Sequence, residues 1–170
     1  MRTFFQFLAY LALGLWLGAL VFFSLILAPL AFGQLPPLFA NQAQGFHAAG
    51  VVVGGSLVRL HWLGLACGVI FLVALALSRP HYRTILPQGL FVFIMLVLTA
   101  YSQFSIIPRM DTARDSIGGS VEAVAANNPG RLIFDHLHTL SVDLELAVLI
   151  CGLLALAATA HLARRQYLQP

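Results

Sequence analysis

The chain has 170 residues, of which 60% are hydrophobic and only 9% are charged. This balance leaves too few polar residues to cover the surface of an ordinary water-soluble domain, and it predicts a membrane protein that contacts the lipid bilayer. The formal net charge of +3 comes from arginines that are dispersed along the sequence, which excludes a concentrated nucleic-acid-binding surface.

Four apolar stretches divide the chain, and each is long enough to cross a membrane as a helix. Crossing the hydrocarbon layer of about 30 Å takes roughly 20 helical residues. The stretches cover 4–32, 51–78, 86–108 and 132–163. We therefore predict an all-α integral membrane four-helix bundle that forms a single domain over residues 1–170. The first stretch greatly exceeds the apolar core of about 7–15 residues in a signal peptide, so we expect a retained helix that Pro29 kinks or ends.

The arginines near the helix ends predict the orientation of the bundle. They precede the first stretch, lie between the second and third, and follow the fourth: Arg2, Arg79, Arg83, Arg164 and Arg165. The first loop, 33–50, carries no formal charge, and the third loop, 109–131, carries arginines and acidic residues together. Because positively charged segments stay on the cytoplasmic side, we predict that both termini are cytoplasmic.

The second stretch contains two ionisable residues, Arg59 and His61. An ionisable side chain within a bilayer costs roughly 2.5–3.5 kcal/mol on insertion scales, so it normally faces protein, water, an ion or a cofactor. The two residues are about 200° apart around a helix and therefore face different surfaces. Pairing Arg59 with Glu145 or Asp143 would relieve two desolvation penalties, and a purely structural ion pair is the alternative to a functional role.

The third stretch ends in a polar segment that contains Tyr101, Gln103 and Ser105. Tyr101 and Ser105 share a helical face, and the Gln103 amide needs a hydrogen-bonding partner at its depth in the membrane. This segment predicts a polar outer half of the bundle. It forms either a packed hydrogen-bond network or a vestibule for a small molecule or an ion.

The polar residues of the fourth stretch divide between two helical faces. One broad face descends from the outer interface toward the middle of the membrane and holds Asp135, His138, Ser141 and Glu145. His136 and Asp143 point to nearly the opposite side. We expect the first face to line the bundle interior and the second face to contact a partner protein.

The remaining motifs are few. Cys67 and Cys151 lie far apart in sequence and lack CxxC spacing, so we expect buried free thiols. The third loop has room for a short helix around 121–126, and Asn128 before Pro129 is typical of a helix start. The sequence contains no nucleophile elbow, phosphate-binding glycine loop or hydrolase triad, so we assign no catalytic residues and favour a nonenzymatic protein.

Three parts of the sequence carry a family resemblance that covers most of the chain. Their sequences are LWLGALVFF at 15–23, YSQF at 101–104 with IPRM at 107–110, and FDHLHTLS at 134–141. They resemble a family of uncharacterised four-helix bacterial membrane proteins, which is similar to a eukaryotic transmembrane protein associated with platinum-drug resistance. The resemblance implies a multi-pass protein of the bacterial inner, or cytoplasmic, membrane.

More distantly, four spans with helix-borne histidines resemble the CopD-like copper-resistance proteins and the HemJ-type protoporphyrinogen oxidases. That resemblance implies copper or haem b as a cofactor, with His61 and His138 as metal or haem ligands in the outer half of the bundle. The chain has no lysine and so departs from the histidine-plus-lysine pattern of the HemJ type. Two other functions stay open: an accessory or assembly subunit of a larger membrane complex or homo-oligomer, and small ion or proton transport through His138 and Glu145.

Overall fold

The computed structural model describes residues 1–78 and 82–168, without the side chains of residues 2, 82–85 and 161–168. Arg79, which contributes to the predicted orientation, lies outside the described residues, as do the side chains of Arg2, Arg83, Arg164 and Arg165. Every regular element in the described part of the chain is helical, and four helical segments are long and apolar enough to cross a membrane. This confirms the predicted all-α class with four membrane spans. The location of both termini on the cytoplasmic side stays a prediction.

Two of the four spans are interrupted by a π-helical turn. The first span combines α1 (Arg2–Phe22), a π-helical turn (Phe23–Leu27) and α2 (Ala28–Gln34), and the second is the single helix α3 (Gln42–Leu77). The third span combines α4 (Tyr82–Tyr101), a π-helical turn (Ser102–Ile106) and α5 (Ile107–Ser116), and the fourth is α6 (Pro129–Leu168). Short 3₁₀ turns lie in the connections at Pro36–Leu38 and Val121–Ala123.

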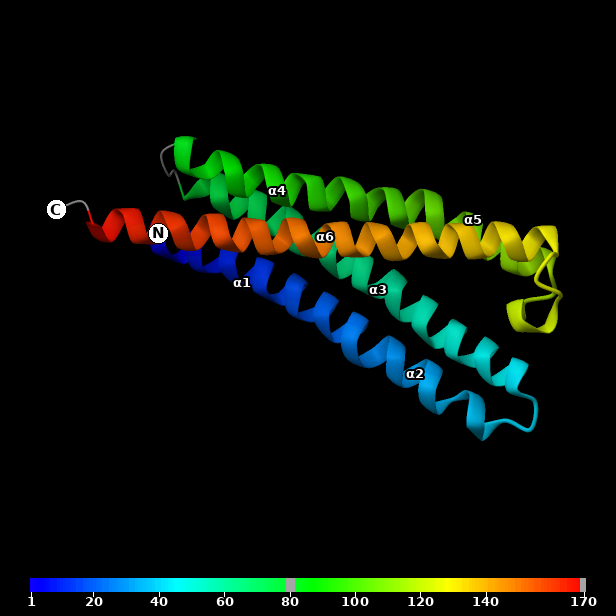
Figure 1. The fold of residues 1–170 in the computed structure, drawn as a ribbon. Coiled ribbons are helices and arrows are strands. Elements are labelled where there is room, and N and C mark those ends of the chain that lie inside the picture. The colour runs from blue at the N-terminus through cyan, green and yellow to red at the C-terminus, as the bar shows by residue number, and fades with distance from the viewer. Residues whose placement is uncertain (79–81, 169–170) are drawn as a thin grey trace.

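The helices form a ring in which neighbours in the sequence are neighbours in space. Helix α1 packs on α3, α3 on α4, α4 on α6, and α6 on α1, so α3 and α6 stand at opposite corners. Helix α1 begins and α6 ends at the same end of the bundle, which we call the terminal end (Figure 1). The connections 35–41 and 117–128 lie at the other end, the loop end. Toward the loop end, α2 and α3 diverge from α5 and α6 (Figure 1).

Close packing between the helices depends on glycines. Gly64 of α3 lies against the Trp16 ring, and Gly152 of α6 lies against the Leu17 side chain. Lipid provides little hydrophobic drive between helices, so close van der Waals contact at small residues holds the bundle together. The large apolar side chains that are almost fully buried are Leu13, Trp16, Leu20, Phe71, Val92, Met95, Ile106 and Val148.

Pro29 and Pro108 lie inside spans, each shortly after a π-helical turn, without ending them. Each proline follows its π-helical turn by two residues. A proline has no N–H to donate, and the N–H of the residue just before each proline donates to the carbonyl five residues earlier. Of the two outcomes expected at Pro29, a kink or an end, the helix does not end there, because the wider turn lets it continue to Gln34.

The third connection is mostly irregular. Gly118 and Gly119 have φ values of 78° and 86°, a conformation that glycine adopts without a steric penalty, and they end α5. The short helix expected around 121–126 is a single 3₁₀ turn at Val121–Ala123. Helix α6 begins at Pro129 as predicted, and the Asn128 side chain accepts a hydrogen bond of 2.9 Å from the Gly130 N–H.

The contact at Gly64 gives a test of the packing. A Cβ at this position would overlap the Trp16 ring, which is 2% exposed, whereas a Cβ at Gly54 on the same helix would meet no atom within 4 Å. We expect Gly64→Ala to lower the free energy of unfolding by about 1–3 kcal/mol, as overpacking does. Gly54→Ala is the matched control and should be neutral or stabilising, because alanine favours a helix over glycine. Unfolding in mixed detergent micelles would measure both, and equal stability of the two variants would contradict the packing.

Candidate functional site

Helices α3 and α6 each direct one ionisable side chain into the centre of the bundle. The imidazole Nε2 of His61 lies 2.5 Å from the Glu145 carboxylate oxygen Oε1. His61 is 1% exposed and the Glu145 side chain is 12% exposed, so both groups are largely removed from solvent. Because α3 and α6 stand at opposite corners, this contact crosses the whole bundle. We call these two residues the central pair.

A glutamine on the third span fixes how the central pair holds its proton. Nδ1 of His61 lies 3.0 Å from Oε1 of Gln103, in the second π-helical turn. An amide oxygen can only accept, so the Nδ1–H of His61 donates to it. Nε2 is then left to face Glu145. The ring is either neutral and accepts from a protonated carboxyl, or charged and donates to a carboxylate.

Both protonation states leave the central pair with no net charge. One proton lies between Nε2 of His61 and Oε1 of Glu145, and the hydrogen bond is charge-assisted when the pair is ionic. Removing either partner would leave the other buried without a counter-charge, which is far less favourable than keeping the pair.

The surroundings of the central pair differ between the two ends of the bundle. On the terminal side, the nearby buried side chains include Cys67, Met95 and Val148, and also the polar Thr99, which precedes Gln103 by one helical turn on the span that runs toward the loop end. Toward the loop end, Ser141 is buried one helical turn before Glu145. The hydroxyls of Thr99 and Ser102 on the third span are buried and have no hydrogen-bonding partner among the residues that the structure describes.

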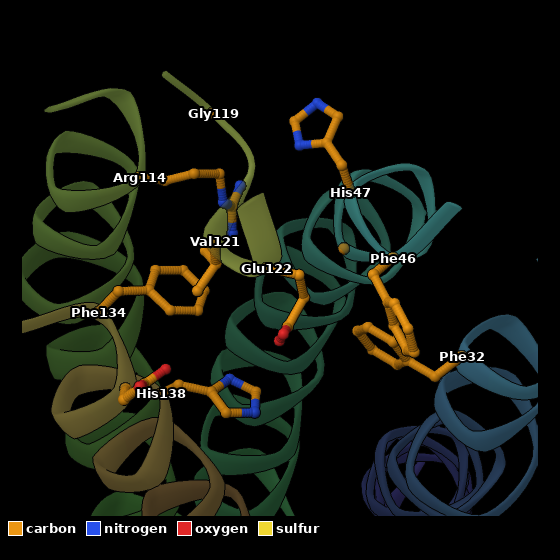
Figure 2. A pocket seen from close by; sticks show the side chains of 11 residues that line it. Phe32, Phe46, His47, Arg114, Gly119, Val121, Glu122, Phe134 and His138 are labelled. Atoms are coloured by element: carbon orange, nitrogen blue, oxygen red, sulfur yellow. The ribbon is translucent and has the colours of Figure 1, made fainter. Parts of the chain in front are cut away.

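A pocket of about 180 Å³ lies at the loop end, where the helices diverge. Its walls come from α2, α3, α5, α6 and the third connection. In Figure 2, the His138 ring and the Glu122 carboxylate both point into this space, and the Phe32 and Phe46 rings lie together on the opposite wall. The pocket therefore combines an aromatic wall with ionisable groups.

Stacking orients the His138 ring at the pocket. It lies parallel to the Phe134 ring, with 6.0 Å between the centroids and 5° between the planes. The Arg114 guanidinium carbon lies 5.2 Å from the centroid of the same phenyl ring, within the range of a cation–π contact. Arg131 lies 3.4 Å from the Glu122 carboxylate and 3.6 Å from that of Asp135. These contacts link the third connection to the start of α6.

The polar face expected on the fourth span runs from the pocket to the centre of the bundle. Asp135 and His138 line the pocket, Ser141 is buried, and Glu145 belongs to the central pair. From His138 to Glu145 the helix rises about 10 Å. Gln103, a member of the expected polar network, contacts His61, whereas Tyr101 from the same network is exposed.

The structure differs from the expected pairing of Arg59. Glu145 contacts His61, and the Arg59 guanidinium donates a hydrogen bond of 2.9 Å to the Gly55 carbonyl on its own helix. Arg59 lies about 160° away from His61 around α3 and points out of the bundle. His136 and Asp143, the residues expected to face a partner, are both exposed.

The structure separates the two histidines that the distant resemblance implies as ligands. His138 lines the pocket, whereas both ring nitrogens of His61 are occupied by hydrogen bonds. No group of three or more histidine, cysteine, aspartate or glutamate residues that could hold a metal ion occurs among the described residues. Cys67 and Cys151 are free, and Cys67 is buried as predicted whereas Cys151 is partly exposed.

Sequence reasoning missed the aromatic wall of the pocket and Arg114. Phe32, Phe46 and Arg114 come from three different elements, and no spacing in the sequence connects them. The only local signal was the placement of Phe134 four residues before His138, which puts their side chains on one helical face.

Comparison with known families and proteins gives one match. A family model described as Domain of unknown function (DUF4149) matches residues 11–118, which is more than half of the chain and includes His61 and Gln103. No curated protein and no solved structure matches the sequence.

The hydrogen bond from His61 to Gln103 gives a test of the site geometry. Gln103→Leu leaves the buried Nδ1–H without an acceptor, and we expect it to lower the free energy of unfolding by about 1–3 kcal/mol. In a His61→Leu background the same substitution should cost much less, because the donor is gone. Gln44→Leu, at an exposed position of α3, is the control. Equal costs of Gln103→Leu in the two backgrounds would contradict the contact.

Proposed function

We propose that this chain, which belongs to the family described as Domain of unknown function (DUF4149), is a membrane protein that binds a proton at the centre of its bundle. The proton exchanges with the pocket at the loop end. The observation that carries the proposal is the contact of 2.5 Å between His61 and Glu145, which buries one shared proton between two spans.

The chemistry of the central pair supports this function. Histidine is the side chain whose protonation ordinarily changes near neutral pH, and a buried carboxyl can hold or release a proton according to its neighbours. Ionisable groups within membrane spans are rare and commonly mark proton relays. Gln103 accepts from Nδ1 in either protonation state, so the proton moves at Nε2 without any rotation of the ring.

The polar face of α6 supports exchange from the loop end. His138 lies at the pocket, and Ser141 lies between it and Glu145 on the same helical face. A serine hydroxyl both donates and accepts, so it suits a step in a relay. The close packing on the terminal side, where Gly64 lies against the Trp16 ring, supports exchange through the loop end. With both termini cytoplasmic, as the arginines predict, the proton would come from outside the bacterial inner membrane.

A metal or haem function fits the residues less well. A histidine binds a metal through a free ring lone pair, and His61 uses one nitrogen as a donor to Gln103 and the other toward Glu145. His138 alone is a single ligand beside the pocket. The donor set therefore does not fit copper or haem b held between His61 and His138, the ligand role that the resemblance to CopD-like and HemJ-type proteins implies.

The two glutamates of the chain allow a direct test. Only Glu122 and Glu145 would carry a ¹³C label introduced at the glutamate carboxyl, and Glu122 is an exposed internal reference. In liposome-reconstituted protein, we expect the ¹³C chemical shift of the Glu145 carboxyl to change when the pH is varied on the side of the membrane that the loop end faces. His61→Gln should move it to the position of a protonated carboxyl, since the buried carboxylate loses its cationic partner, and should leave the Glu122 resonance unchanged.

Asp143→Asn is the matched control for this experiment. It removes an exposed carboxylate two residues from Glu145 on the same helix, so it should leave the Glu145 response to pH intact. If the Glu145 resonance responds neither to pH nor to His61→Gln, the central pair is a structural hydrogen bond only, and the proposed proton binding is wrong. A response to pH at the terminal end would contradict exchange through the pocket.

A further inference from the structure

We infer that copies of this chain associate side by side in the membrane, with Arg59 of one copy paired to Asp143 of the next. Both residues lie within the spans and both are exposed on the surface of the bundle. They carry opposite charges. The inference concerns the outer surface of the bundle and does not depend on the proton-binding function of its centre.

The two residues lie at the same level along the bundle axis. Arg59 precedes His61 by two residues, and Asp143 precedes Glu145 by two residues. Helices α3 and α6 both run from the loop end to the terminal end, so each charge lies about 3 Å nearer the loop end than the contact between His61 and Glu145. A neighbouring copy in the same membrane orientation brings the two charges together without any shift along the membrane normal.

The two residues face away from each other within one chain. Each lies about 160° around its helix from the residue that points into the centre. Since α3 and α6 stand at opposite corners of the ring, Arg59 and Asp143 project from opposite sides of the bundle. They cannot pair within one copy, whereas two adjacent copies present one charge each at a shared boundary.

The hydrogen bonding of both residues is incomplete for a membrane interior. The one hydrogen bond of the Arg59 guanidinium among the described residues goes to the Gly55 carbonyl on its own helix. The Asp143 carboxylate has no hydrogen bond or ion pair among the side chains that the structure describes. Charged side chains in spans normally pair with one another, so we expect each of these residues to have a partner of opposite charge.

The surfaces around the two charges suit contact between helices. On α3, Gly55 lies one turn before Arg59, and its missing Cβ leaves room for the Arg59 guanidinium to lie along the helix surface, where it is available to a neighbouring helix. On α6, Thr139 and Leu146 flank Asp143 and are exposed along the same face. The contact joins two different surfaces, so it repeats head to tail and forms a ring or a row of copies.

Charge reversal in two differently tagged, co-expressed copies tests the pairing. When both copies carry Arg59→Asp, or both carry Asp143→Arg, like charges meet at every boundary, and we expect co-purification in mild detergent to fall at least about tenfold. When one copy carries Arg59→Asp and the other carries Asp143→Arg, every boundary between them regains opposite charges. This mixture should restore most of the wild-type yield.

The mixture also controls for misfolding, because it contains the same two variant chains. Asp115→Arg, at an exposed position near the end of α5, should leave co-purification unchanged. Wild-type copies that fail to co-purify would overturn the inference, even if another membrane protein were captured. A mixture that yields as little as the two variants alone would overturn the pairing of Arg59 with Asp143.

Discussion

The contact between His61 and Glu145 is the constraint on which the arrangement of the bundle depends. It joins helices at opposite corners and fixes the level and the rotation of α3 relative to α6. Each partner would be costly alone inside a membrane, so the contact stabilises the bundle mainly by preventing an uncompensated buried charge. The same contact sets the outward direction of Arg59 and Asp143, because each is two residues from a member of the central pair.

Close helix packing and ionisable side chains lie toward opposite ends of the bundle. Toward the terminal end, contacts such as Gly64 with Trp16 bring the helices close together. Toward the loop end the helix pairs diverge, and aromatic and ionisable side chains line the space between them. The central pair lies where these regions meet, with close packing on its terminal side and the polar face of α6 on the side of the pocket.

The all-α class and the four spans could be predicted from the sequence because length and hydropathy are local properties. The partner of Glu145 could not be predicted from the sequence. Arg59 and His61 differ by only about 3 Å in depth, and the choice between them depends on the rotation of α3 about its axis. Contacts between residues distant in the sequence, such as Gly64 with Trp16, are consistent with the rotation that places His61 opposite Glu145. The pocket could not be predicted from the sequence either, because Phe32, Phe46 and Arg114 line one space only through the divergence of the helices.

The π-helical turn before Pro108 has a consequence for hydration. Ile107 donates its N–H to the Ser102 carbonyl, and Pro108 has no N–H. The backbone carbonyl of Gln103 is therefore left without a donor from the following turn of its own helix. In a membrane such an acceptor needs another hydrogen-bond donor, and a water molecule that reached it from the loop end would supply one. The residue whose side chain orients His61 thus also offers a binding point for water through its main chain.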